Sequence, residues 1–149
     1  MSRPAPTVLL ADDHKLVRLS VREELEAAGF AVCAEAETAA EALELALRNR
    51  PDLCILDVSM PGGGLSAAAE ISRHVPDSRI VMLTASVREE HLLEAVRSGA
   101  SGYLLKDDDP TRLPIALRDV LNGIPAFPRR LSVGLVAAAR SGLRATSSA

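Results

Sequence analysis

Aromatic side chains are scarce in this chain of 149 residues: they make up 2% of it, with no tryptophan, one tyrosine and two phenylalanines. The core must therefore be built mainly from leucine, valine, isoleucine and alanine. The hydrophobic share is nevertheless 48%, which excludes a largely disordered chain. A chain of this length is sufficient for one domain with a substantial core.

Long apolar runs and a surplus of basic residues are also missing. No run of about 18 apolar residues occurs, so the sequence predicts no membrane span, and the N-terminus lacks the apolar centre of a secretory signal. With 17 basic and 20 acidic residues the net charge is −3, which argues against nucleic-acid binding by this segment itself. We therefore expect a cytoplasmic location.

Cysteine is rare as well. Cys33 and Cys54 both lie in apolar, strand-like runs. Because of these apolar surroundings we interpret both as small core residues of a protein in a reducing cytosol.

What the chain does contain is four apolar runs, each closed by polar residues. The pairs of run and closing residue are 7–11 with Asp12 and Asp13, 53–56 with Asp57, 80–83 with Thr84, and 102–105 with Lys106. Short apolar runs of this kind are typical of buried parallel strands, whose carboxyl ends share one edge of the sheet. Three carboxylates, a hydroxyl and an amine should thus converge on one crevice, where they could hold a divalent cation and receive a phosphoryl group.

Strand-like and helix-like patterns alternate along the chain. A capping box formed by Thr38 and Glu41 predicts one helix start, and Asp109 followed by Pro110 predicts another, with the proline at the first helical position. The Met-Pro-Gly-Gly-Gly sequence at 60–64 predicts an irregular loop. The expected strands are 7–11, 30–36, 53–57, 79–84 and 102–106, and the expected helices are 14–28, 38–50, 65–74, 88–98 and 110–122. Five such units predict a doubly wound α/β fold with right-handed crossovers.

The last stretch differs in composition. Pro125 and Pro128 interrupt the pattern, and an apolar stripe then predicts a sixth helix that contains Leu131, Leu135, Val136 and Ala139. Residues 141–149 are rich in small and polar residues, which is typical of a mobile tail.

Four segments together carry a family resemblance over about residues 6–123: Leu-Leu-Ala-Asp-Asp-His, Ile-Leu-Asp-Val-Ser-Met-Pro, Met-Leu-Thr-Ala and Gly-Tyr-Leu-Leu-Lys. In this order and spacing they resemble the receiver domain of bacterial two-component response regulators. The wording Gly-Ala-Ser-Gly-Tyr-Leu-Leu-Lys-Asp, without a proline after the lysine, is most similar to the subfamily with a LuxR-type helix-turn-helix output domain.

The resemblance implies a flavodoxin-like, five-stranded parallel sheet with strand order 2-1-3-4-5 and an extra C-terminal helix. Residues 1–123 would form the receiver domain. Residues 124–149 would be a linker with the extra helix and tail, leading toward a DNA-binding domain that this chain does not contain. DNA would be contacted only through that domain.

Asp57 is the expected phosphoacceptor, since an ionised carboxylate can attack phosphorus without a base. Three clustered carboxylates repel each other by roughly 4 kcal/mol per pair at about 4 Å in an effective dielectric of about 20, and a hard cation such as Mg²⁺ removes this repulsion. The resemblance implies that Asp13 and Asp57 bind Mg²⁺ directly, with the main-chain carbonyl of Ser59 as a third ligand and Asp12 acting through water.

Lys106 supplies a point charge for the phosphoryl group, and the resemblance implies that the Thr84 hydroxyl binds a phosphoryl oxygen. It also implies that Tyr103 swings inward when Thr84 moves; the alternative for Tyr103 is an exposed strand aromatic. The phosphate contacts would then bias a two-state equilibrium. The implied partners are a sensor histidine kinase, and a second copy of the chain at the face formed by 88–98, 102–106 and 110–122.

Two other functions compete with a phosphorylation switch that catalyses only its own phosphorylation and dephosphorylation. An aspartyl-phosphate phosphatase needs a second acid two residues after its nucleophile, and Ser59 occupies that position. A phosphorylation-independent, receiver-like interaction module would be favoured by the loss of Asp13, Asp57 or Lys106, and all three are present.

Three local features depart from the family or remain open. The loop after Asp57 looks about one residue shorter than the usual family loop, and its three glycines predict a mobile loop. Ser59 and Ser86 occupy the positions at which the family tunes dephosphorylation. We interpret His14 as an ordinary helix-start residue and His91 as a solvated helix position.

Overall fold

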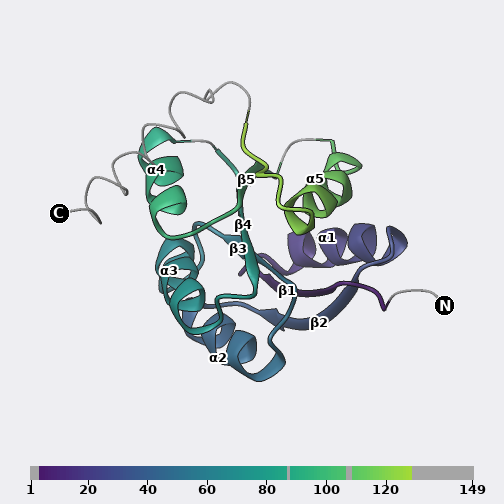
Figure 1. Cartoon of the computed structure of the whole chain (residues 1–149), viewed down its shortest axis with the longest axis horizontal. Coiled ribbons are helices and arrows are strands. Elements are labelled where there is room, and N and C mark those ends of the chain that lie inside the picture. Colours follow the sequence, from purple (N-terminus) through teal and green to yellow (C-terminus); the bar gives the residue numbers. More distant parts are fainter. Residues whose placement is uncertain (1–3, 87, 107–108, 129–149) are drawn as a thin grey trace.

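A computed structural model describes residues 4–86, 88–106 and 109–128 of the chain. Its centre is a five-stranded parallel sheet with the order β2-β1-β3-β4-β5 (Figure 1). The strands are β1 (Thr7–Ala11), β2 (Ala31–Ala36), β3 (Leu53–Asp57), β4 (Arg79–Thr84) and β5 (Gly102–Leu105). The predicted doubly wound, flavodoxin-like arrangement is thereby confirmed.

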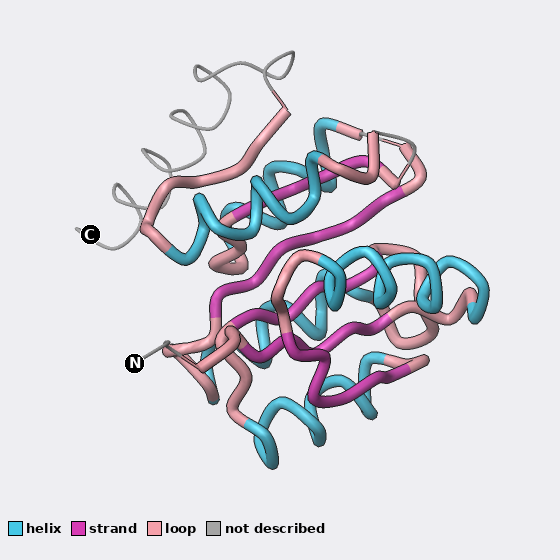
Figure 2. Tube along the Cα trace, turned by 90° about the vertical axis from the view of Figure 1, so that its right-hand side faces the viewer, coloured by secondary structure: helices cyan, strands magenta, loops and turns pink. Residues whose placement is uncertain are grey.

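Helices cover both faces of this sheet. They are α1 (Lys15–Ala27), α2 (Ala39–Asn49), α3 (Gly64–His74), α4 (Glu89–Arg97) and α5 (Arg112–Leu121). Helices α1 and α5 lie on one face and α2, α3 and α4 on the other (Figures 1 and 2). None of the helices in the part of the chain that the structure describes is long and apolar enough to cross a bilayer.

Two apolar clusters form the core, one on each face of the sheet. All five positions of β3 are buried, and its side chains alternate between the clusters. Cys54 and Leu56 belong to the cluster under α2, α3 and α4, whereas Leu53 and Ile55 belong to the cluster under α1 and α5. This burial on both sides explains why the strand is a continuous apolar run rather than an alternating pattern.

Local signals place most helix ends correctly. The Thr38 side chain accepts the Glu41 N–H at 3.1 Å, so the predicted cap by Thr38 is present. The Glu41 carboxylate accepts the N–H of Glu37 at 3.3 Å rather than that of Thr38, so the reciprocal bond of the predicted capping box is absent. Gly29 follows the end of α1 with a φ of +93°, a left-handed conformation in which a glycine carries no steric penalty.

The predicted start of α5 is wrong. Asp109 does not cap the helix; its carboxylate accepts the N–H and the hydroxyl of Thr111 in a turn before it. The helix begins at Arg112. The physical reason is Pro114, which lacks an N–H and is tolerated only in the first turn. A helix beginning at Pro110 would have placed Pro114 beyond that turn.

The interpretation of Cys33 as a core residue is also wrong. Val8 pairs with Val32 and Leu9 pairs with Ala34, so Cys33 is the extra residue of an irregularity in the edge strand β2. Such a bulge leaves its extra residue outside the regular pairing. The side chain of Cys33 is therefore exposed, whereas Cys54 is buried as predicted.

The segment that follows α5 lies along the free edge of β5. Ala126 pairs with Gly102 in a parallel bridge; the Ala126 N–H donates to the Ser101 carbonyl, and its carbonyl accepts the Tyr103 N–H at 2.8 Å. Phe127 packs against the cluster that contains Tyr103. The start of the predicted linker thus covers the sheet edge. The predicted sixth helix and the 141–149 tail lie outside the described residues.

Candidate functional site

The polar residues that close four strands meet at the carboxyl edge of the sheet. Asp57 ends β3 and Thr84 ends β4, and these strands are neighbours, with Asp57 opposite Leu83. The Lys106 N–H donates to the Thr84 carbonyl at 2.7 Å, which extends the β4–β5 pairing by one residue. Asp12 follows β1 directly, where its N–H donates to a carbonyl of β2. The sheet order therefore brings together residues that are far apart in sequence.

A buried ion-pair cluster forms the centre of the site. The Lys106 ammonium lies 2.8 Å from Asp12 Oδ2 and 3.2 Å from Asp57 Oδ1. Lys106 is the only partner of Asp12 Oδ2 among the described residues, in an ion pair that lacks the alignment of a hydrogen bond. Asp57 is 1% exposed. One cation thus holds two shielded carboxylates in place.

The two carboxylates differ in their electrostatic situation. Burial and the negative charge of Asp12 raise the pKa of Asp57 above its ordinary value. Burial also acts to raise the pKa of Asp12, but Lys106 and the His14 N–H outweigh it, so this pKa is lowered. The pKa of Lys106 is raised, since both carboxylates together outweigh the effect of its burial. Lys106 therefore compensates Asp12 better than it compensates Asp57.

One oxygen of Asp57 lacks a partner. Asp57 Oδ1 faces Lys106 and accepts the Ser59 N–H at 3.3 Å, but Asp57 Oδ2 is buried and receives no hydrogen bond from the described part of the chain. A buried acceptor in this state is costly. An orphaned carboxylate oxygen beside two further acids fits a divalent cation with oxygen ligands.

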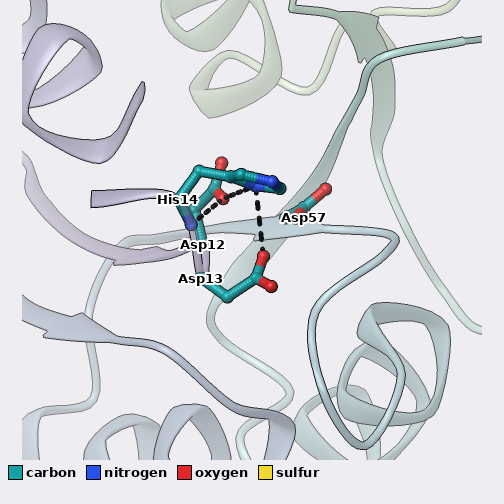
Figure 3. A group of neighbouring side chains, drawn as sticks. All are labelled: Asp12, Asp13, His14 and Asp57. Atoms are coloured by element: carbon teal, nitrogen blue, oxygen red, sulfur yellow. Dashed lines mark hydrogen bonds and ion pairs between the residues drawn. The ribbon is translucent and has the colours of Figure 1, made fainter. Parts of the chain in front are cut away.

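Asp13 and His14 form the rim of the site. The carboxylates of Asp12, Asp13 and Asp57 and the His14 imidazole each offer a ligand atom within 4.8 Å of the others (Figure 3). His14 Nδ1 lies 3.1 Å from Asp12 Oδ1 and 3.2 Å from Asp13 Oδ1. The sequence interpretation treated His14 as an ordinary helix-start residue and missed this contact. The signal was available, because His14 directly follows the acid pair.

Arg18 supports the loop that carries the acid pair, and sequence reasoning missed it too. Its Nη1 donates to the main-chain carbonyl of Asp12 at 2.6 Å, and its Nε donates to Glu35 at 2.9 Å. The side chain is 11% exposed. Arg18 thus ties the β1–α1 loop to the edge of β2.

Thr84 and Tyr103 lie on adjacent strands of the same region. The Thr84 hydroxyl donates to the Ser86 carbonyl at 2.9 Å. Tyr103 is fully buried and its hydroxyl has no hydrogen-bond partner among the described residues; burial raises its pKa. The alternative of an exposed strand aromatic is therefore wrong.

The glycine-rich loop after Asp57 is packed tightly against the site. Gly64 belongs to α3, so the predicted irregular loop is one residue shorter than expected. The Gly64 N–H donates to the Val58 carbonyl at 3.1 Å, and a Cβ on Gly64 would lie 2.0 Å from the Asp57 carbonyl oxygen. Only glycine allows α3 to begin this close to the end of β3.

The fold and the site together define a class of protein. It is a doubly wound α/β protein with a cluster of acidic side chains, ion-paired to a lysine, at the carboxyl edge of its sheet. The family model for the response regulator receiver domain matches residues 8–118. The chain belongs to the response regulator receiver family, which is a family of signalling proteins and not of conventional enzymes.

Relatives and solved structures agree with this membership. The chain is 39% identical over 137 residues to the oxygen regulatory protein NreC of Staphylococcus epidermidis, covering 87% of this chain and 61% of that protein. It is 39% identical over 118 residues to the response regulator UvrY of Escherichia coli, covering 78% of this chain and 54% of that protein. The chain thus spans little more than half the length of these relatives.

A crystal structure of a LuxR-family two-component response regulator from Aurantimonas superposes with a TM-score of 0.82 at 34% identity, covering 92% of this chain and 99% of that one. At this TM-score and identity the two chains share the same fold.

Proposed function

We propose that this chain is a phosphorylation switch in which Asp57 accepts a phosphoryl group from a phosphohistidine of a sensor kinase. The observation that carries the proposal is the state of Asp57, which is buried, poorly compensated and left with one unpartnered oxygen beside Lys106. Such a carboxylate is shielded from water and has an oxygen free to form a new bond.

The transfer forms an O–P bond at Asp57 and breaks the P–N bond of the donor, with the donor imidazole as the leaving group. Lys106 neutralises charge on the phosphoryl oxygens after it releases part of its contact with Asp57. The Thr84 hydroxyl turns from the Ser86 carbonyl toward the phosphoryl group. Phosphoryl transfer depends largely on this kind of positioning and charge neutralisation.

Mg²⁺ is the proposed cofactor, with Asp13, Asp57 and the Ser59 carbonyl as direct ligands and Asp12 acting through water. When bound, it supplies a positive charge that offsets the carboxylates and the incoming phosphoryl oxygens. The three clustered acids and the unpartnered Asp57 oxygen support this fit. The chain's own residues then catalyse only its phosphorylation and dephosphorylation.

Incubation with acetyl phosphate and Mg²⁺ tests the proposal by intact-protein mass spectrometry. We expect a gain of about 80 Da, the mass of one PO₃H group, in the wild type and no gain in Asp57→Asn. Asp77→Asn is the matched control, because Asp77 is exposed in the turn before β4, at the opposite edge of the sheet. Labelling that persists in Asp57→Asn, or that is absent from the wild type, would contradict the proposal and favour an interaction module.

We further propose that phosphorylation controls a homodimer and, through a LuxR-type domain outside this chain, transcription. Residues 1–123 would be the receiver, and 124–149 would lead toward that domain. In support, NreC is described as an oxygen regulatory protein, and the match covers 61% of its length. Sedimentation with beryllofluoride and Mg²⁺ should show a larger species than metal-free protein, and an unchanged profile would argue against the dimer.

A further inference from the structure

The bulge in the edge strand β2 decides which side chains of this strand face α1. Before the bulge, Val32 pairs with Val8, and both belong to the cluster under α1 and α5. In a regular strand the side chain three positions after Val32 would lie on the opposite face of the sheet. The extra residue Cys33 shifts the alternation by one, so Glu35 pairs with Leu10, which again belongs to the cluster under α1 and α5. The bulge thus directs the Glu35 carboxylate toward α1.

The Glu35 carboxylate binds two arginines of α1 that differ in their other contacts. Arg18 Nε donates to Glu35 Oε1 at 2.9 Å, and Arg22 Nη1 donates to Glu35 Oε2. The Nε of Arg22 donates to Glu26 on the same helix, and the Arg22 side chain is 39% exposed. Arg18 Nη1 instead donates to the main-chain carbonyl of Asp12 at 2.6 Å, and its side chain is 11% exposed. Among the described residues, Arg18 alone therefore connects Glu35 to the backbone of Asp12.

The backbone of Asp12 is held to β2 on both of its polar sides. Its N–H donates to the Ala36 carbonyl at 2.9 Å, and its carbonyl accepts Arg18. The peptide group that contains the Asp12 carbonyl also contains the Asp13 N–H, and a peptide group is planar. The orientation of this one group therefore determines where the Asp12 and Asp13 carboxylates lie relative to each other and to Asp57.

We propose that Arg18, anchored by Glu35, is a positioning residue for the transfer of a phosphoryl group to Asp57. The inference rests on the proposed function and adds to it a residue that contacts neither phosphate nor metal. The positive charge of Arg18 is matched by Glu35 at 2.9 Å and by Glu37 at 3.3 Å, so Arg18 acts on the site by position rather than by charge. Phosphoryl transfer depends on fixed positions of the charged groups, and a loose peptide at 12–13 would remove that fixed arrangement.

The dependence of labelling on Mg²⁺ concentration tests this inference in the whole chain. With acetyl phosphate, Arg18→Gln should need about 10-fold more Mg²⁺ than the wild type for half-maximal labelling, as is typical when support for a metal ligand is lost. Arg22→Gln is the matched control, because it loses a bond to the same Glu35 but no contact with Asp12. It should stay within about two-fold of the wild type.

Arg18→Lys separates position from charge. Lysine keeps the positive charge but lacks the planar guanidinium that bonds to Glu35 and to the Asp12 carbonyl at once. We expect Arg18→Lys to remain close to Arg18→Gln in its Mg²⁺ dependence. Full recovery of labelling in Arg18→Lys would show that the charge suffices and would overturn the inference.

Nuclear magnetic resonance of the metal-free protein gives a readout that is independent of labelling. The Asp13 amide ¹⁵N signal reports on the peptide whose carbonyl accepts Arg18. It should shift in Arg18→Gln and stay unchanged in Arg22→Gln. If Arg18→Gln does not fold, Glu35→Gln replaces it, because this variant weakens the same connection and leaves the arginine in place; it should shift the Asp13 signal in the same direction as Arg18→Lys.

The outcomes distinguish the inference from the proposed function. Equal Mg²⁺ dependence of labelling in Arg18→Gln and Arg22→Gln, or an Asp13 signal that responds equally to both, overturns the inference. A wild type without Asp57-dependent label, combined with an Asp13 signal that shifts only in Arg18→Gln, overturns the proposed function and leaves the attachment of the peptide to Arg18 in place.

Discussion

Lys106 lies between the two buried carboxylates of Asp12 and Asp57 and stabilises them unequally. It is closer to Asp12 than to Asp57, and Asp12 has in addition the His14 N–H at 2.9 Å. Asp57 has a longer ion pair and one free oxygen. The two aspartates thus have pKa values shifted in opposite directions, lowered for Asp12 and raised for Asp57. The poorly compensated carboxylate is the proposed reactive one, which is the usual relation between strained electrostatics and function.

This contrast predicts opposite effects of two Asp→Asn substitutions on metal-free protein. At pH 7 in EDTA, Asp57→Asn should raise the free energy of unfolding by about 1 kcal/mol, because it removes a poorly compensated buried charge. Asp12→Asn should lower it by about 1–3 kcal/mol, because it removes the better partner of Lys106. Urea denaturation measures both, and a shared sign would contradict the assigned roles.

The pH dependence follows from the directions of the two pKa shifts. Asp57 has a folded pKa above its ordinary value of 3.8, so the folded state binds the extra proton and stability falls as pH rises from 3.8 through the folded pKa. The advantage of Asp57→Asn at pH 7 should therefore shrink as pH falls toward 3.8. Saturating Mg²⁺ should reverse the order of stability at pH 7, since only the wild type keeps all three carboxylates.

The β3–α3 connection shows how one element end positions the site. The first residue of α3, Gly64, packs directly against the last residue of β3, Asp57. The loop between them also contacts α2, because Ala39 donates its N–H to the Pro61 carbonyl. A Cβ on Gly62 would lie 2.8 Å from the Ala39 Cβ. The short glycine loop is thus packed between two helices, and it carries Ser59 next to Asp57.

Substitution of Gly64 tests this packing. Gly64→Ala places a Cβ against the Asp57 carbonyl and should lower the free energy of unfolding by about 3 kcal/mol, at the upper end of overpacking costs. It should also weaken Mg²⁺ binding, because the displaced loop carries the Ser59 carbonyl. Gly123→Ala is the control: its Cβ would meet nothing within 4 Å, although its φ is +82°, and should cost only about 1 kcal/mol. Equal losses in the two variants would refute the packing argument.

At the scale of the whole molecule, β5 connects the site to the segment 124–127 that follows α5. Tyr103 is the link: its side chain fills the core next to Thr84, and its N–H bonds to Ala126. Phe127 packs in the same cluster as Tyr103. A change in the position of Tyr103 would therefore displace the segment around Ala126 and Phe127.

Ala126→Pro tests this attachment, since it removes the N–H that donates to Ser101. We expect a loss of about 1 kcal/mol in the free energy of unfolding and faster hydrogen exchange at the Tyr103 amide. Ile124→Ala trims an exposed side chain and should change stability by less than about 0.5 kcal/mol. Unchanged exchange at Tyr103 in Ala126→Pro would show that the segment is not coupled to β5.

Local sequence patterns were sufficient to predict most of the secondary structure of this protein. Periodicity, caps and glycines predicted the five strands and the helices to within a few residues, because these signals act between near neighbours in the chain. The strand ends also predicted which edge would collect Asp12, Asp57, Thr84 and Lys106. Pro114 is the exception among the local signals: it favours a start of α5 at Arg112, whereas Asp109 and Pro110 predicted an earlier start.

Other features depended on contacts between distant segments. Four features each require a partner from another part of the chain. They are the bulge at Cys33, the burial of Tyr103, the unequal ion pairs of Lys106 and the pairing of the segment 124–127 with β5. A strand pattern does not specify register irregularities, and a composition does not specify which oxygen remains unpartnered. Register irregularities and unpartnered oxygens are decided only when the strands and helices pack together, because neighbouring segments then compete for the same space and the same hydrogen bonds.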